Sequence, residues 1–188
     1  MIRVGIAGVT GWTGRAVAEA VESTDDLELV FGVARSDPAR FSTVAEALDA
    51  VEADVLVDYT HAAVVAANVR AAVERGVGVV VGSSGTAREI AERLAEVRTP
   101  IVGVPLEDVL GAAEARGATI AGTQVHSLRL PGFVVSTEVL FAAPGERLTL
   151  RHDAGDSPAP YVAGTLLAIR AVPELVGLTR GLDRLLPG

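Results

Sequence analysis

The chain has 188 residues, no cysteine, three histidines and a formal net charge of −8 at pH 7. The lack of cysteine excludes disulfides and thiolate chemistry and favours a reducing compartment, so we expect a cytoplasmic protein. The negative charge would repel a phosphate backbone, and charged residues and glycines interrupt every apolar run before about 18 residues, so we expect neither a nucleic-acid partner nor a membrane.

Over the first hundred residues, apolar runs typical of buried strands alternate with segments of helical periodicity. The strand-like runs span residues 2–8, 27–34, 54–60, 77–85 and 100–105. The helix-like segments span 13–23, 41–51, 61–76 and 87–97. Ser42 or Thr43 is placed to cap the second helix, and Gly76 to end the third. Five strands separated by four helices predict a right-handed, mostly parallel α/β sheet.

Beyond residue 106 the apolar pattern changes to a period near two, which is typical of antiparallel strands. It covers residues 118–130 and 133–155, and an Ala-Pro-Gly-Glu turn interrupts the second run. Short helical patterns lie at 106–117 and 161–172. The predicted fold class is α/β, with a Rossmann-like parallel sheet and a small antiparallel sheet domain inserted before the C-terminal helix.

Three glycines follow the first strand and open the first helix with the spacing G-x-x-G-x-x-G. They are Gly8, Gly11 and Gly14, and Trp12 and Thr13 lie between the last two. Glycines at such a turn allow the backbone to approach a ligand closely, and the N–H groups at a helix start attract a pyrophosphate. The turn predicts a dinucleotide site; the competing interpretation is that the glycines serve strand-to-helix packing.

The residues after the second strand indicate which ribose is bound. An acidic residue there accepts hydrogen bonds from a 2′-hydroxyl, whereas this chain has Ala34, Arg35 and Ser36. Arginine can hold a 2′-phosphate through its two-pronged guanidinium, so NADPH is favoured and NADH is less favoured as the cofactor. Asp37 is the competing acidic residue, and Arg35 on a solvated loop is the plainer interpretation.

Two strand ends further along the chain carry a resemblance to a known family. Asp58, Tyr59 and Thr60 are followed by a Gly-Ser-Ser-Gly turn at 82–85, and a second region of likeness covers residues 125–156 and 164–186. These stretches resemble the dihydrodipicolinate reductase family, whose pattern is Asp-Phe-Thr and then Gly-Thr-Thr-Gly. The resemblance implies a Rossmann-like fold, and it implies that the following residues lie near the ribose and nicotinamide: Tyr59, Thr60, Gly82, Ser83 and Ser84.

The chain departs from that family in the region that would hold the substrate. Between Pro105 and about Ala118 the family carries a strand ending in His-His-x-x-Lys-x-Asp and a Pro-Ser-Gly-Thr-Ala loop, which serve proton donation and carboxylate binding. This chain has no His-His pair and no lysine at all. We therefore expect that it does not catalyse the family's lysine-pathway reaction. The family assembles through its C-terminal sheets, which implies a homo-oligomer, a dimer or a tetramer.

Three residues are candidates for catalysis, each with a plainer alternative. His61 follows Thr60 and is a candidate proton donor or substrate contact, or a residue at a helix start. His126 is a candidate general acid, or an ordinary sheet histidine. Tyr161, like Trp12, is placed to stack on a ring, or to pack. The histidines are too dispersed for a metal site, so none is expected.

These features favour an NADPH-dependent reductase of a C=N or conjugated C=C bond in a specialised biosynthetic intermediate, a small molecule. The alternative is a non-redox cyclase or isomerase, or a noncatalytic binding module on the same scaffold. We expect residues 1–105 and 157–188 to form the dinucleotide-binding domain and residues 106–156 a reduced substrate and oligomerisation domain. Oligomer contacts are expected through residues 120–152: if the more apolar face of the strand at 133–141 packs within the subunit, the other face still carries Val134 and Leu140 and would be covered by a second copy.

Overall fold

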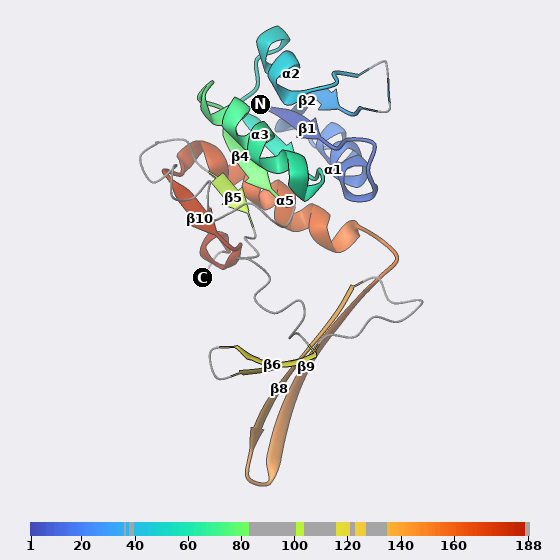
Figure 1. Ribbon diagram of the computed structural model, residues 1–188. Coiled ribbons are helices and arrows are strands. Elements are labelled where there is room, and N and C mark those ends of the chain that lie inside the picture. Colours follow the sequence, from blue (N-terminus) through green and yellow to red (C-terminus); the bar gives the residue numbers. More distant parts are fainter. Residues whose placement is uncertain are drawn as a thin grey trace. The chain divides into compact units, whose positions relative to one another are not determined.

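The computed structural model describes residues 1–35, 37, 40–82, 101–103, 116–120, 123–126 and 135–186. The chain divides into two compact units (Figure 1). The first comprises Met1–Asp108 and Tyr161–Gly188, and the second comprises Val109–Pro160. The segment 87–97 and residues 106–115, for which helices are expected, lie outside the described residues. The last two residues of the expected 106–117 helix, Arg116 and Gly117, instead begin a strand, because this stretch pairs with the strand that follows.

Six described strands of the first unit form one parallel sheet in the order β2-β1-β3-β4-β5-β10. Their bounds are Ile2–Ala7 (β1), Leu27–Val33 (β2), Val55–Asp58 (β3), Gly78–Val81 (β4), Ile101–Gly103 (β5) and Leu178–Arg180 (β10). The sequence predicts the first five. It misses β10, which pairs Leu178 with Ile101, because a three-residue strand is too short to display a period.

Helices cover both faces of this sheet, as a doubly wound fold requires. The described helices are Trp12–Glu22 (α1), Val44–Ala50 (α2), Ala62–Val73 (α3) and Ala159–Ala171 (α5). Helices α1 and α5 share one apolar core with Val4 and Ile6 of β1, and α2 and α3 share the other with Leu56 of β3. Strand β3 is buried along its whole length, which explains the apolar run Val55–Val57 that precedes Asp58. The predicted Rossmann-like class is confirmed.

Side chains cap two of these helices. The hydroxyl oxygen of Thr43 accepts from the backbone N–H of Glu46 at 3.2 Å, and the Glu46 carboxylate accepts from the Thr43 N–H at 3.2 Å. Of the two candidate caps, Thr43 is therefore the one that acts, in a reciprocal capping box. Nδ1 of His61 caps α3 by accepting from the Ala63 N–H at 3.2 Å.

The described part of the second unit contains two antiparallel ribbons, and the predicted antiparallel character of this region is confirmed. Strands β6 (Arg116–Ile120) and β7 (Thr123–His126) form one, and β8 (Val135–Ala143) and β9 (Glu146–Gly155) form the other. Gly145 adopts a φ of 83° in the turn between β8 and β9, where a β-branched residue would be strained.

The β8–β9 ribbon is amphipathic. Val139 pairs with Leu150 and Phe141 with Leu148, so these four side chains share one side, which we call the apolar ribbon face. They are between 42% and 56% exposed. The opposite side carries Arg151, which forms ion pairs with acidic groups of the same ribbon. A two-stranded ribbon is marginally stable by itself, and this one leaves its apolar side chains in contact with solvent.

Candidate functional site

The sheet order reverses between β1 and β3, so their carboxyl ends are the expected place for a ligand. The chain goes from β1 to β2 on one side and then crosses to β3 on the other, and ligands of open α/β sheets bind where the order reverses in this way. Gly8 follows β1, Arg35 lies near the end of β2, and Tyr59 follows β3. Gly82 follows β4. The candidate cofactor residues thus converge on one edge of the sheet.

The glycine turn is shaped by close backbone contacts. Gly8 has a φ of +82°, and a Cβ there would lie 2.8 Å from the carbonyl oxygen of Tyr59. A Cβ on Gly14 would lie 2.1 Å from the carbonyl oxygen of Gly8, and the Gly11 N–H donates to that same oxygen at 2.9 Å. Packing alone therefore accounts for glycine at positions 8 and 14, whatever the turn binds.

The start of α1 fits an anionic ligand for a separate reason. Within the described part of the chain, its N-cap Gly11 has no side-chain cap and its first turn holds no acidic residue, in contrast to the caps of α2 and α3. The first N–H groups of a helix have no partner inside it, and the helix dipole favours negative charge there. The N–H groups of Trp12, Thr13 and Gly14 are thus placed to hold a pyrophosphate.

Two arginines lie at the end of β2. Arg35 is exposed and makes no ion pair or hydrogen bond with the described residues. Arg40, which is not among the residues predicted for the cofactor, lies over Gly32, where a Cβ would meet its guanidinium at 2.8 Å. Asp37, the competing acidic residue, pairs with Arg40 at 3.5 Å. Ser36 lies outside the described residues. A second arginine only five positions after Arg35 was the feature of the sequence that could have indicated Arg40.

A buried carboxylate organises the end of β3. Asp58 accepts hydrogen bonds from the backbone N–H of Thr60 at 2.8 Å, from the Thr60 hydroxyl at 2.6 Å and from the Asn68 amide at 2.8 Å. The hydroxyl proton of Thr60 goes to Asp58, and its oxygen accepts from the Asn68 amide at 3.4 Å. Thr60 therefore has no proton to donate to a ligand. The family pattern includes Asp58, but only the structure reveals Asn68.

Tyr59 is held between β4 and α5. Its hydroxyl lies 2.6 Å from that of Thr165, and burial raises the pKa of the phenol. Its ring occupies the space beside Gly82, where a Cβ would lie 2.1 Å from the ring atom Cε1. Tyr59 therefore contacts the candidate site with its ring and directs its hydroxyl into the protein. Ser83 and Ser84 lie outside the described residues.

The candidate catalytic residues lie in different surroundings. His61 is exposed and uses Nδ1 to cap α3, so a neutral ring carries its proton on Nε2. The ring of Tyr161 meets that of Trp12 edge-on, with centroids 6.1 Å apart. His126 is the last residue of β7, opposite Arg116, and its side chain lies outside what the structure describes. Among the described residues, no group of three or more histidine or acidic side chains could hold a metal ion.

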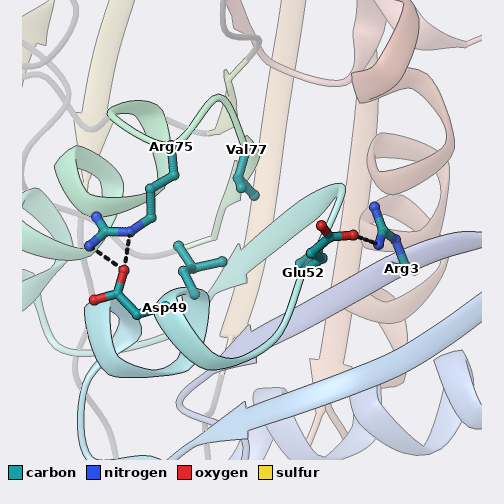
Figure 2. A pocket seen from close by; sticks show the side chains of 7 residues that line it. Arg3, Asp49, Glu52, Arg75 and Val77 are labelled. Carbon is teal, nitrogen blue, oxygen red and sulfur yellow. Dashed lines mark hydrogen bonds and ion pairs between the residues drawn. The ribbon is translucent and has the colours of Figure 1, made fainter.

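A polar pocket lies at the opposite edge of the sheet, near the amino ends of the strands (Figure 2). Its charged side chains already pair with one another. Arg3 lies 2.6 Å from Glu52, and Arg75 lies 2.8 Å from Asp49. Hydrogen bonds to Asp54 and Glu52 raise the pKa of Arg3. Because these residues lie at the amino ends of the strands, the pocket is separate from the glycine turn, which follows the carboxyl end of β1.

A doubly wound sheet with a glycine turn at the point where its order reverses defines a Rossmann-like α/β protein. Comparison with known proteins identifies the family. A model described as dihydrodipicolinate reductase, N-terminus, matches residues 2–106, and one described as dihydrodipicolinate reductase, C-terminus, matches residues 81–184. The chain belongs to the dihydrodipicolinate reductase family, as the sequence indicated. Members are NAD(P)H-dependent oxidoreductases, and the expectation of such an enzyme is confirmed.

Similar proteins include the 4-hydroxy-tetrahydrodipicolinate reductases of Mycobacterium sp. (strain KMS) and Nocardia farcinica (strain IFM 10152). Both are 31% identical, and the alignments cover 98% and 97% of this chain and 99% and 97% of those proteins. A solved structure, dipicolinate-bound dihydrodipicolinate reductase from Paenisporosarcina sp. TG-14, matches with a TM-score of 0.76. It is 21% identical and covers 99% of this chain and 100% of that one, which supports the fold.

The alignments also show that this chain is shorter than its relatives. The alignment with the Mycobacterium protein runs over 249 positions, 61 more than the 188 residues of the chain. At least 61 of those positions therefore have no counterpart here.

No described helix is long and apolar enough to span a membrane.

Proposed function

We propose that this chain is an NADPH-dependent reductase of a C=N or conjugated C=C bond in a small molecule other than the lysine-pathway substrate. The observation that carries the cofactor part is the uncapped start of α1, beside a glycine turn at the reversal of the sheet order. The observation that supports a different substrate is the absence of lysine and of a His-His pair in a chain at least 61 positions shorter than its alignment.

In this proposal the chain's own residues divide the binding of the dinucleotide among three strand ends. The N–H groups of Trp12, Thr13 and Gly14 hold the pyrophosphate, and the ring of Tyr59 and the oxygen of Thr60 border the nicotinamide end. The bound cofactor supplies the hydride, and the protein orients the acceptor. His61, His126 and Tyr161 remain the candidates for proton transfer, and Ser83 and Ser84 for further cofactor contacts.

The preference for NADPH rests on the charges after β2. Ala34 is buried and has no acceptor for a ribose hydroxyl, whereas Arg35 is exposed and is left without an acidic partner among the described residues. Arg40 provides a second cation at the same strand end, where it also forms an ion pair with Asp37. A 2′-phosphate would complement these two guanidinium groups better than a free ribose would. Ser36 belongs to the same proposed phosphate site.

The cofactor proposal is tested by titrating the purified protein with NADPH and NADH. Arg35→Ala should weaken NADPH binding by roughly 1 to 3 kcal/mol, the scale of a hydrogen bond to a charged group, and leave NADH nearly unchanged. Equal losses for both dinucleotides would show that Arg35 does not bind the 2′-phosphate. Failure of the wild-type protein to bind either one would favour the non-redox enzyme or the binding module.

The substrate proposal is tested by complementation. A strain that lacks its own 4-hydroxy-tetrahydrodipicolinate reductase should not grow without lysine when it expresses this chain, because the family's proton-donating and carboxylate-binding cluster is missing. Immunoblotting of the expressed chain and rescue by a full-length relative serve as controls. Growth of the strain would overturn this part of the proposal, while an unsaturated intermediate that consumes NADPH absorbance would identify the substrate.

We further propose that the chain forms a homo-oligomer, a dimer or a tetramer, through the antiparallel strands of residues 120–152. The apolar ribbon face supports this, because a second copy of the same face would cover it in a two-fold contact. Leu148→Glu should lower the sedimenting mass, whereas Thr149→Glu, one residue along and on the opposite side, should not. A wild-type monomer at micromolar concentration would overturn the proposal.

A further inference from the structure

Four side chains connect helix α5 to both sides of the candidate cofactor crevice. Tyr161 and Thr165, one turn apart on α5, contact Trp12 at the start of α1 and Tyr59 at the end of β3. The residues of the Tyr59–Thr165 pair are 106 positions apart in the sequence. We call these four residues the α5 brace.

The direction of the hydrogen bonds in the α5 brace follows from counting protons. The Thr165 hydroxyl donates to the backbone oxygen of Tyr161 at 2.8 Å, since a carbonyl oxygen can only accept. Its one proton is then used, so the 2.6 Å bond with Tyr59 has the Tyr59 hydroxyl as the donor. Thr165 is buried. The phenol proton of Tyr59 therefore points into the protein and is not available to a substrate.

Both ends of the α5 brace lie beside the backbone that is expected to hold the cofactor. The ring of Tyr59 fills the space where any side chain at Gly82 would lie, so its position sets how the chain leaves β4. Trp12 is the first residue of α1, and its ring is 43% exposed while one side meets Tyr161. A shift of α5 would therefore displace Trp12 and Tyr59 together.

We propose that Tyr59, Thr165 and Tyr161 are positioning residues for the dinucleotide. Tyr161 supports the ring of Trp12, and Tyr59, held by Thr165, supports the backbone at Gly82. In this role Tyr161 acts through its ring, as the support of Trp12, and its hydroxyl is not required. This inference rests on the proposed function, since it concerns the same cofactor. It goes beyond that function by assigning α5, which contributes no glycine or arginine to the site, a share in cofactor affinity.

The first measurement needs no cofactor. Trp12 is the only tryptophan of the chain, so the emission of the protein reports its surroundings. Replacing Tyr161 with leucine removes the ring contact and should shift the emission of Trp12 to longer wavelength, toward that of a more solvated indole. Tyr161→Phe retains the ring and should leave the emission close to that of the wild type. Identical emission in the leucine variant and the wild type would show that the ring of Tyr161 does not support Trp12, and it would overturn the inference.

The second measurement is dinucleotide affinity, with unfolding curves to establish that each variant is folded. Thr165→Val and Tyr161→Leu should each weaken binding by about fivefold or more, the scale of a lost hydrogen bond in the first variant and of a lost aromatic contact in the second. Tyr59→Phe combined with Thr165→Val should be no weaker than Thr165→Val alone, because the two residues share one interaction. Tyr161→Phe should bind like the wild type, and a loss there would give the phenol a direct role and overturn the inference.

Arg170→Ala is the matched control on the same helix. Arg170 pairs with Asp26 at 2.7 Å and lies five residues along α5 from Thr165, the nearest α5 residue of the brace. Its loss therefore loosens α5 elsewhere and should change affinity less than twofold. An equal loss in this variant would show a general structural effect and overturn the inference. If the wild type binds no dinucleotide, the proposed function fails as well, whereas normal binding by Thr165→Val and Tyr161→Leu would overturn the inference alone.

Discussion

Replacing Gly14 with alanine tests whether the glycine turn is set by backbone packing. The new Cβ would lie 2.1 Å from the carbonyl oxygen of Gly8 and 2.8 Å from its carbonyl carbon. Those atoms are restrained, because the Gly8 N–H donates to the Val33 oxygen at 3.0 Å and the Gly11 N–H donates to the Gly8 oxygen at 2.9 Å. The turn must therefore move by roughly 1 Å to reach an ordinary contact distance.

Two opposing terms decide the magnitude. Alanine in place of glycine favours a helix interior by about 1 kcal/mol, and overpacking a rigid site costs about 1 to 3 kcal/mol. Since the collision is with backbone, we expect the cost to exceed the gain by about 1 to 2 kcal/mol. Gly164→Ala in α5 is the matched control: its Cβ would lie 2.6 Å from Cδ1 of Leu182, the end of a flexible side chain that can move aside.

Urea unfolding and dinucleotide titration provide the assay. Gly14→Ala should be less stable than the wild type and should bind the dinucleotide more weakly, because the displaced turn presents its N–H groups wrongly. Gly164→Ala should be at least as stable as the wild type, because helix propensity adds up to about 1 kcal/mol and Leu182 can move aside, and it should leave affinity intact. A Gly14 variant that unfolds at the wild-type urea concentration and binds normally would refute the argument from packing.

Two further predictions concern other parts of the first unit. Thr43→Ala should cost about 0.5 to 2 kcal/mol of stability through loss of the capping box, and Ser42→Ala should be nearly neutral; the reverse order in urea unfolding would assign the cap to Ser42. The Arg3 guanidinium lowers the pKa of Asp54, so this pair stabilises the fold above about pH 4 and loses its effect as the pH falls through the lowered pKa. Arg3→Met should therefore be destabilised most near neutral pH, and a deficit that stays constant down to pH 2 would contradict this assignment.

Much of the fold could be predicted from the spacing of apolar residues within short stretches of the sequence. The apolar run Val55–Val57 of β3 and the helical spacing around Val17 and Val21 predict their elements, because burial on two faces or on one face dictates where apolar residues recur. The glycine spacing also indicated a turn that must pack closely, and Gly14 does so against Gly8. These inferences succeed because each depends on residues only a few positions apart.

Three features of the molecule were decided by the tertiary structure. Strand β10 exists because Leu178 meets Ile101, and three residues display no period of their own. The Tyr59 hydroxyl donates to Thr165, 106 positions away, which no spacing within a motif could indicate. Arg40 reaches the end of β2 through the fold of its loop. Sequence determines which side chains seek burial or a polar partner, but the distant residue that meets them is set only when the elements pack together.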